Sequence, residues 1–205
     1  MNKLRECDEN PIDNFILKST AKVLPYLKHL KVVPNHITSI SVLFGVLSFI
    51  SLYYGYVWLA IPLLIFQYVF DCMDGQYARK YNMVTVFGDA YDHVSDLVFF
   101  IGITLLVFTK TTKSKTDMVL PSLLLGISLL FCLVHFGCQE SLYETDKPSK
   151  TLQFVRPWCQ NPEKKIKYTR FFGTGTFYTA FVVWIVYMLN WLVPPMCNDL
   201  MMKQN

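Results

Sequence analysis

Residues 57–79 read VWLAIPLLIFQYVFDCMDGQYAR, and residues 88–108 read GDAYDHVSDLVFFIGITLLVF. Each stretch joins an apolar run to a polar one. The apolar parts, 57–70 and 97–108, have 14 and 12 residues, whereas a membrane-spanning helix needs about 20. Each helix can therefore cross a bilayer only if it takes the neighbouring polar residues with it, so charged side chains are expected at membrane depth.

The two stretches are predicted to form an antiparallel hairpin, because the link Lys80–Phe87 between them is only eight residues long. Their polar ends then meet at one face of the membrane. Helical spacing places two carboxylates on one face of each helix, namely Asp71 with Asp74 and Asp92 with Asp96. With Asp89, five carboxylates converge near one depth. The only other Asp, Glu, Lys or Arg residues in 32–109 are Arg79 and Lys80.

The composition of the chain places it in the membrane class. Of its 205 residues, 53% are hydrophobic and 17% are charged, against about 25% charged in an average soluble domain. Mean hydropathy is +0.32. Scarce charge and long apolar runs exclude a soluble globular fold, a disordered chain and a coiled coil. Three more runs without Asp, Glu, Lys or Arg are long enough to span, and these are Pro34–Gly55, Met118–Cys138 and Phe171–Pro195.

The expected fold is therefore all-α, a polytopic transmembrane helical bundle with five to six spans. Residues 1–33 are predicted to form an N-terminal arm with an interfacial helix. Residues 34–195 then form a single transmembrane domain that carries the carboxylates, and residues 196–205 form a tail.

The segment 11–32 is predicted to be the interfacial amphipathic helix, with an ordinary solvated arm as the alternative. Asn10 supplies a cap, Pro11 occupies the first turn, and Asp13 adds an early acid. Apolar side chains then recur with partial helical periodicity, although Pro25 interrupts the pattern.

Positive charge predicts the orientation of the bundle. The polar segment 139–170 is expected to be a loop. If it shares a side with the N-terminus and with the carboxylate end of the hairpin, that side has fifteen Lys and Arg residues and the other side has four. The positive-inside bias makes the crowded side cytoplasmic. We therefore expect a multi-pass integral membrane protein whose carboxylate cluster faces the cytoplasm.

The six cysteines have no CxxC spacing, and two of them, Cys132 and Cys138, lie inside an apolar run. They are interpreted as small apolar residues or incidental thiols. No disulfide framework is predicted.

Five carboxylates at membrane depth repel one another, so they need positive charge nearby, which divalent cations supply. Oxygen ligands without a nearby Cys or His pair favour a hard ion, Mg²⁺ or Mn²⁺, over zinc. Four carboxylates from two helices suffice for two ions about 4 Å apart, the arrangement that clamps the oxygens of a phosphoryl displacement. Arg79 then suits a phosphate, and small residues leave room for a ligand near the backbone at Gly75, Ala78 and Gly88.

These residues carry a resemblance to a known family. The pattern Asp71-x2-Asp74-Gly75-x2-Ala78-Arg79-x8-Gly88-x3-Asp92-x3-Asp96 matches, position for position, the signature of the CDP-alcohol phosphotransferase family, class I of the CDP-alcohol phosphatidyltransferases. Upstream, Pro34, Asn35 and Thr38 resemble the Pro-Asn-x-x-Thr start of that family's first span. The resemblance covers residues 34–108.

The resemblance implies a membrane enzyme of phospholipid biosynthesis that moves a substituted phosphate from a CDP-alcohol to a second alcohol and releases CMP. It implies that two Mg²⁺ or Mn²⁺ ions are held by Asp71, Asp74, Asp92 and Asp96. It also implies that Asp96 is the general base and that the CDP site is lined by Gly75, Ala78 and Arg79, to which we add Gly88. The family core usually has six spans, whereas five are counted here.

The partners that follow from this resemblance are a CDP-alcohol donor, a lipid or polar alcohol acceptor, membrane lipids and, in a homodimer, a second copy of the chain. No nucleic acid is expected. Two other classes of function compete. A cation or proton transporter would distribute its acids over the depth of several spans, whereas here they gather at one end of one hairpin. A non-catalytic homologue would bind nucleotide or lipid without turnover.

His93 and Asp89 offer a second candidate for the base, because a carboxylate-oriented imidazole is suited to take a proton near neutral pH. The pattern Gly88-x3-Asp92-His93 is similar to the choline and ethanolamine phosphotransferase branch, whose acceptor is diacylglycerol. That branch is slightly favoured. The alternative is a phosphatidyltransferase that uses CDP-diacylglycerol and a small polar alcohol such as inositol, serine or glycerol phosphate.

Overall fold

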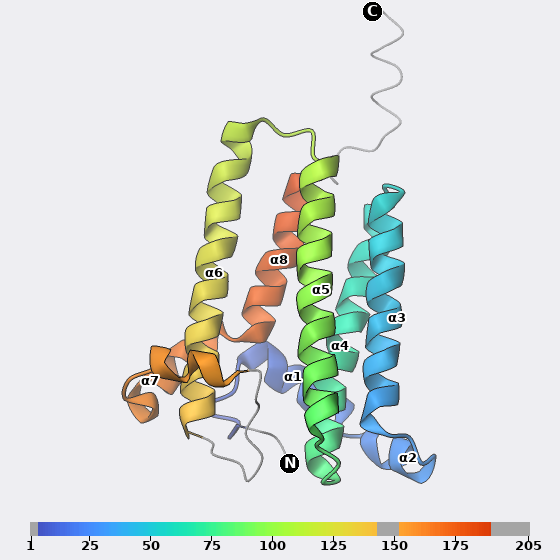
Figure 1. Cartoon of the computed structure of the whole chain (residues 1–205), viewed down its shortest axis with the longest axis vertical. Coiled ribbons are helices and arrows are strands. Elements are labelled where there is room, and N and C mark those ends of the chain that lie inside the picture. Colours follow the sequence, from blue (N-terminus) through green and yellow to red (C-terminus); the bar gives the residue numbers. More distant parts are fainter. Residues whose placement is uncertain (1–3, 143–151, 190–205) are drawn as a thin grey trace, which may run out of the picture.

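The computed structural model describes residues 4–142 and 152–189, and this part of the chain contains helices and no strands (Figure 1). The long helices are α3 (Pro34–Tyr53), α4 (Val57–Lys80), α5 (Val86–Lys110), α6 (Lys115–Leu142) and α8 (Thr174–Met188). The shorter elements are α1 (Pro11–Thr20), α2 (Leu24–His29) and α7 (Pro162–Thr169), with the 3₁₀ helices η1 (Gln153–Trp158) and η2 (Arg170–Phe172). The predicted all-α fold is confirmed.

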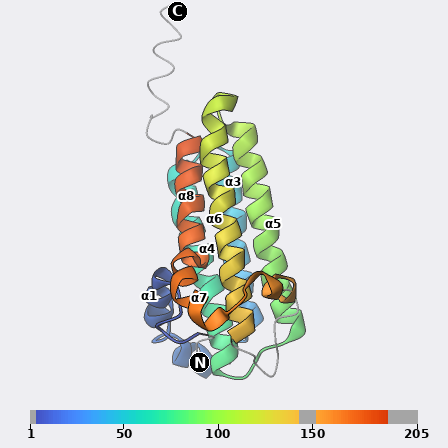
Figure 2. The same cartoon turned by 90° about the vertical axis from the view of Figure 1, so that its left-hand side faces the viewer.

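Five helical stretches among the described residues are long and apolar enough to cross a membrane, judged by length and composition. Four are α3, α4, α5 and α6, and the fifth, Pro162–Met188, contains α7, η2 and α8. The long helices run side by side, and α1, α2 and α7 gather at one end of the bundle (Figures 1 and 2). The predicted polytopic bundle is confirmed with five spans. Residues 190–195 of the predicted last span, and the tail 196–205, lie outside the described residues.

The α4–α5 hairpin is present, and its link is shorter than expected from the sequence, because both helices extend into it. α5 begins early because Thr85 caps it: the Thr85 side chain accepts a hydrogen bond of 3.0 Å from the backbone N–H of Gly88. The polar ends of the two helices therefore meet at the end of the bundle where α1 and α2 lie (Figure 1).

Small polar side chains allow α3 and α4 to pack closely. The Ser41 hydroxyl donates to the carbonyl oxygen of Gln67 at 2.8 Å, and the Ser48 hydroxyl donates to that of Ala60 at 2.9 Å. Buried hydroxyls need such partners, and short side chains let two helix backbones approach each other. The contacts fix α3 against the helix that carries the first two aspartates of the motif.

The largest apolar core lies toward the opposite end of the bundle from α1 and α2. It joins all five long helices through buried side chains that include Leu52, Leu64, Ile103, Val107, Leu125, Phe181, Trp184, Ile185 and Met188. Other apolar side chains point outward, and on α5 they form an exposed stripe of Val94, Leu97, Val98, Ile101 and Leu105. In a membrane protein such a stripe faces lipid. Inside the bundle, the end with this core is apolar, whereas the end with the aspartates is polar.

The N-terminal segment forms two helices, and the prediction of one helix over 11–32 is wrong. α1 ends at Thr20 and α2 begins at Leu24, with Pro25 in its first turn. Proline has no N–H, and its ring clashes with the carbonyl four residues earlier, so Pro25 favours a break between two helices at this point.

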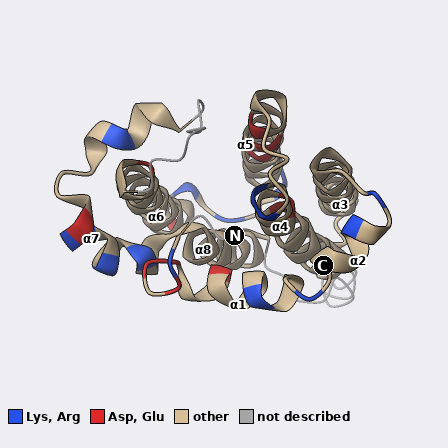
Figure 3. Cartoon of the chain, turned by 90° about the horizontal axis from the view of Figure 1, so that it is seen from below, with Lys and Arg blue, Asp and Glu red and all other residues tan. Residues whose placement is uncertain are grey.

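α1 lies across the bundle, against α4 and α8 (Figures 1 and 3). The predicted cap is confirmed, since the Asn10 side chain accepts a hydrogen bond of 3.0 Å from the N–H of Ile12. The same side chain donates to the carbonyl oxygen of Arg170 at 2.7 Å. One turn further, the Tyr68 hydroxyl of α4 donates to the carboxylate of Asp13. These contacts dock α1 onto two spans.

The segment 139–170 is not the simple loop that its polarity predicts. α6 continues to Leu142, and both η1 and α7 lie in the described part of the segment. α7 is amphipathic: Ile166 is buried, while the lysines beside it are exposed. A helix with one apolar residue per turn has too weak a periodic signal to stand out in a polar segment.

A disulfide joins Cys138 near the end of α6 to Cys159, the residue after η1. Both cysteines are buried and pack with Ile166. The interpretation of the cysteines as incidental thiols is therefore wrong for this pair. The two cysteines pair because η1 and α7 fold back onto α6. The spacing of Cys138 and Cys159 in the sequence does not predict this packing.

Candidate metal centre

Three aspartates from two helices form the centre of the candidate site. Asp71 comes from α4, and Asp92 and Asp96 come from successive turns of α5. Each offers one carboxylate oxygen, and the three oxygens lie within 4.8 Å of one another. Seen from below, acidic segments of α4 and α5 lie next to each other (Figure 3). The predicted convergence is confirmed for these three residues.

Asp74 lies one turn after Asp71 on α4 and is not a member of that group. Its carboxylate accepts a hydrogen bond of 2.5 Å from the hydroxyl of Thr38 on α3. Both side chains are buried. The fourth predicted ligand is therefore held beside the group by the first span, and its role as a ligand stays a prediction.

The three carboxylates suit a hard divalent cation. Asp92 Oδ1 is buried and has no hydrogen-bond partner among the described residues. An orphaned carboxylate oxygen beside two others is a costly arrangement without a cation, because the charges repel and no N–H of the described residues offsets the burial. Oxygen-only donors match Mg²⁺ or Mn²⁺. The residues present thus fit the expected metal.

Arg79 lies one turn beyond Gly75 on α4, and its guanidinium folds back over that glycine. A Cβ at Gly75 would lie 3.0 Å from Arg79 Nη1, so the absence of a side chain at Gly75 makes room for the Arg79 guanidinium. The Nε of Arg79 is buried without a hydrogen-bond partner in the described structure. A guanidinium with a free donor, on the helix that carries Asp71, is suited to bind a phosphate oxygen.

Gly88 occupies the first turn of α5 next to α3. A Cβ there would lie 3.2 Å from Asn35 Oδ1 and 3.0 Å from Thr85 Oγ1. Asn35 and Gly88 both belong to the motif residues, so the structure brings the start of the first span against the start of α5. Ala78 lies on α4 just before Arg79. The roles of these residues as a nucleotide site stay predictions.

His93 meets Asp89 differently from what the sequence suggests. His93 Nδ1 lies 2.7 Å from the backbone carbonyl oxygen of Asp89 and 3.6 Å from its carboxylate oxygen Oδ1. The shorter contact is a hydrogen bond, and the longer one exceeds hydrogen-bond distance. A carbonyl can only accept, so Nδ1 carries the proton and Nε2 of the neutral ring is left as the acceptor.

Gln67 is a residue of the site that the sequence analysis missed. Its Nε2 donates to Asp96 Oδ1 at 3.0 Å, and its Oε1 accepts a 2.5 Å hydrogen bond from the hydroxyl of Tyr178 on α8. A signal existed, because Gln67 is a polar residue inside an apolar run and lies one helical turn before Asp71. No comparable signal marked Tyr178.

Asp13 is a buried acidic residue outside the spanning helices. Burial raises its pKa from an ordinary value of 3.8 to about 6, although hydrogen bonds from Tyr68 and from the backbone of Gly175 partly offset this. A Cβ at Gly175, the second residue of α8, would lie 2.6 Å from Asp13 Oδ1, so glycine allows the start of α8 to lie this close to α1. This polar junction of α1, α4 and α8 adjoins the site through Tyr68, whose ring stacks on that of Tyr178.

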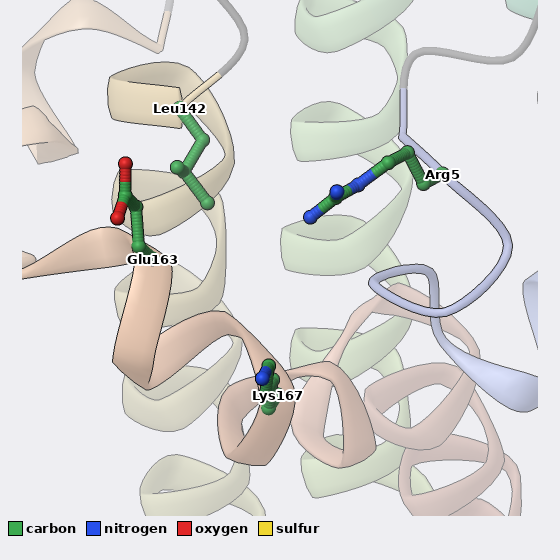
Figure 4. Close-up of a pocket in the computed structure, with 4 residues that line it drawn as sticks. All are labelled: Arg5, Leu142, Glu163 and Lys167. Carbon is green, nitrogen blue, oxygen red and sulfur yellow. The ribbon is translucent and has the colours of Figure 1, made fainter.

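Two open cavities, of about 480 and 540 Å³, lie at the same end of the structure but not over the aspartates. Both are lined by Arg5 and Lys167, and the first also by Leu142 and Glu163 (Figure 4). Their walls come from the N-terminal arm, α6, α7 and the start of the last span. They are therefore surface hollows beside the bundle, and the carboxylate geometry, not cavity size, marks the candidate site.

Comparison with known proteins agrees with this geometry. The family described as CDP-alcohol phosphatidyltransferase matches the chain over residues 31–196. No curated protein and no solved structure matches it. The matched stretch contains all five candidate spans, the three clustered aspartates and the residues around them. The chain belongs to the CDP-alcohol phosphatidyltransferase family.

Proposed function

We propose that this protein is an integral membrane transferase that moves a substituted phosphate from a CDP-alcohol to an acceptor alcohol and releases CMP. Family membership indicates a transferase that uses a CDP-linked alcohol, and five apolar helices support a place in the membrane. The single observation that carries the proposal is the group of Asp71, Asp92 and Asp96 at the polar end of the bundle.

The residues divide the chemistry between them. Asp71, Asp92 and Asp96 would hold the first of two Mg²⁺ or Mn²⁺ ions, and Asp74 would help to hold the second. When bound, these ions neutralise the diphosphate and make CMP a better leaving group. Arg79 would bind a phosphate oxygen of the donor, with Gly75, Ala78 and Gly88 leaving room for the nucleotide.

The transfer exchanges one P–O bond for another. The acceptor hydroxyl oxygen attacks the phosphorus that carries the alcohol, the bond from that phosphorus to the CMP oxygen breaks, and the hydroxyl proton goes to a base. Asp96 is the favoured base because it lies in the cluster of three aspartates. His93 is the alternative, since its Nε2 is left as an acceptor by the contact of Nδ1 with the Asp89 carbonyl.

The favoured substrates are diacylglycerol with CDP-choline or CDP-ethanolamine, on the pattern of Asp92 followed by His93. CDP-diacylglycerol with inositol, serine or glycerol phosphate is the alternative. By the charge bias of the chain, the site faces the cytoplasm, where nucleotides are plentiful. A homodimer is the expected assembly.

The test is a panel of radiolabelled donors with the purified, lipid-reconstituted chain and Mg²⁺ or Mn²⁺. CDP-choline, CDP-ethanolamine and CDP-diacylglycerol are each paired with their acceptors and scored for CMP and for lipid product. One pair is expected to give equal amounts of both, and Asp92→Ala is expected to give neither. CDP-alcohol binding, seen as a rise in melting temperature, without product from any pair would instead identify a non-catalytic binding protein.

A further inference from the structure

We propose that Gln67 and Tyr178 are positioning residues for Asp96, so that α8, which lies outside the sequence motif, takes part in the site. The catalytic consequence of this pair rests on the proposed function. The geometry of the pair is independent of the proposed function, because it consists of contacts between side chains of α4, α5 and α8.

The three side chains form one hydrogen-bonded chain across three helices. The Tyr178 hydroxyl donates to Gln67 Oε1 at 2.5 Å, and Gln67 Nε2 donates to Asp96 Oδ1 at 3.0 Å. The Gln67 side chain is only 4% exposed, so water competes little for these bonds. In the low dielectric of a buried site, each bond is stronger than it would be in water.

The direction of the chain follows from the chemistry of its groups. An ionised carboxylate can only accept, so the amide NH₂ group must face Asp96. If the amide were flipped, the oxygen of Gln67 would lie at 3.0 Å from an oxygen of Asp96, and the two would repel. In that orientation the amide oxygen faces the Tyr178 hydroxyl and accepts its hydrogen bond. The Asp96 carboxylate therefore selects the orientation of Gln67, and the contact with Tyr178 is compatible with it.

Tyr178 is itself held in place from several sides. Its hydroxyl lies 2.9 Å from the carbonyl oxygen of Leu64, and its ring stacks on that of Tyr68 with centroids 4.3 Å apart. Tyr68 is anchored in turn by its hydrogen bond to Asp13 of α1. The backbone of Gln67 is fixed by the hydroxyl of Ser41. The amide that meets Asp96 thus has little freedom to move.

A fixed N–H on one oxygen limits the rotation of the Asp96 carboxylate. Asp96 shares the carboxylate group with Asp71 and Asp92, where a cation needs each oxygen lone pair aimed at it. In the proposed reaction the same restriction aims Asp96 at the acceptor hydroxyl. The hydrogen bonds that connect Tyr178 to Asp96 run through Gln67, and this distinguishes a positioning chain from two independent packing residues.

The test is a double-mutant cycle of Gln67→Met and Tyr178→Phe in the reconstituted full chain. Both variants keep the size of the side chain and remove the polar contact. Two quantities are measured for every variant: kcat with the substrate pair found in the panel, and the dissociation constant of Mn²⁺ alone. Ser48→Ala is the matched control, because it removes a buried hydrogen bond between α3 and α4 without contact to Gln67.

Gln67→Met is expected to lower kcat by about 10- to 100-fold and to weaken Mn²⁺ binding by about 10-fold, with the KM for the CDP-alcohol changed less than about threefold. Tyr178→Phe is expected to lower kcat about 10-fold in the wild-type background and less than about twofold in the Gln67→Met background. Ser48→Ala should leave kcat and Mn²⁺ affinity within about twofold of wild type while lowering the melting temperature.

The inference is overturned if Tyr178→Phe costs the same factor in both backgrounds, or if Gln67→Met leaves both kcat and Mn²⁺ affinity at the wild-type level. If no substrate pair gives turnover, the proposed function fails and the dissociation constants of Mn²⁺ alone decide. Non-additive changes in Mn²⁺ affinity would still support the coupling of Gln67 and Tyr178, and additive changes would reject it. Should Gln67→Met not fold, Gln67→Leu replaces it in the cycle under the same criterion.

Discussion

Thr38 on α3 donates a hydrogen bond of 2.5 Å from its hydroxyl to Oδ2 of Asp74 on α4, and both side chains are 4% exposed. The bond ties the first span to the helix that supplies Asp71. Groups that orient ligands in this way fix the direction of the carboxylate and limit its freedom before a cation arrives. Thr38 is therefore part of the site, although it touches none of the three clustered carboxylates.

Thr38→Val is expected to lower CMP release by about 10- to 100-fold, because the isosteric side chain cannot donate to Asp74. Thr38→Ser keeps the hydroxyl and is expected to stay within about threefold of wild type. The measurement is kcat at saturating donor and metal. Equal activity of the valine and serine variants would show that the hydrogen bond does not orient Asp74.

The stability of the α1 junction should depend on pH through Asp13. Its pKa is raised from 3.8 to about 6 in the folded chain, so the folded state binds the proton more tightly than the unfolded state does. The contribution of Asp13 is therefore most favourable to folding below pH 3.8 and is lost as pH rises through the window from 3.8 to about 6. Above that window, the buried carboxylate costs on the order of 3 kcal/mol.

Asp13→Asn should remove this cost, because the amide oxygen still accepts from Tyr68 and no charge is buried. We expect the variant to melt at a higher temperature than wild type above pH 7 and to lose that advantage near pH 4. Melting in detergent across this range measures it, with Glu163→Gln on the exposed face of α7 as the control. A constant difference between Asp13→Asn and wild type at all pH values would contradict the assignment.

The Cys138–Cys159 disulfide should stabilise the packing of α7 on α6. The two cysteines are 21 residues apart, and closing a loop of that size stabilises a fold by about 3 kcal/mol in the chain-entropy model. Cys159→Ser should therefore lower the melting temperature of the oxidised protein by several degrees, and a reducing agent should lower that of the wild type equally. Cys7→Ser, at an exposed free cysteine, is the control. A reducing agent that leaves the wild type unchanged would show that the bond does not support the fold.

Cys7 also reports the orientation of the bundle. It is exposed, and its backbone carbonyl accepts a hydrogen bond from Arg170 of η2, beside α1 at the end of the bundle that carries the aspartates. If that end is cytoplasmic, a membrane-impermeant thiol reagent should label Cys7 only after the cells are permeabilised. Labelling in intact cells would place the site outside. Disulfides persist in oxidising compartments, so a Cys138–Cys159 bond that stays oxidised in the same cells would contradict the cytoplasmic assignment.

The sequence predicted the parts of the structure that depend on local pattern. Apolar run lengths gave the five spans, and the helical spacing of Asp71, Asp92 and Asp96 placed them where α4 and α5 meet. The cap at Asn10 was also predicted correctly, because capping depends on a few neighbouring residues. Local spacing thus located the candidate metal centre before any tertiary contact was known.

The rest depends on contacts between distant parts of the chain. The pairing of Cys138 with Cys159 requires α7 to fold back on α6, and the sequence places no signal there. Tyr178 meets Gln67 only because α8 packs against α4, so neither residue belongs to the pattern that located the aspartates. Thr38 was visible as part of a motif, but its bond to Asp74 follows from the packing of two spans.

The central claim is that Asp71, Asp92 and Asp96 hold a divalent cation that CMP release requires. Its most direct test is the rate of CMP release from the CDP-alcohol as a function of Mn²⁺ concentration, for wild type and for Asp92→Asn. The account predicts saturable Mn²⁺ dependence in the wild type and a rate at least about 100-fold lower in Asp92→Asn at any Mn²⁺ concentration, a larger loss than that of a residue which only orients a ligand. Wild-type release of CMP by Asp92→Asn, or release without any divalent cation, would contradict it.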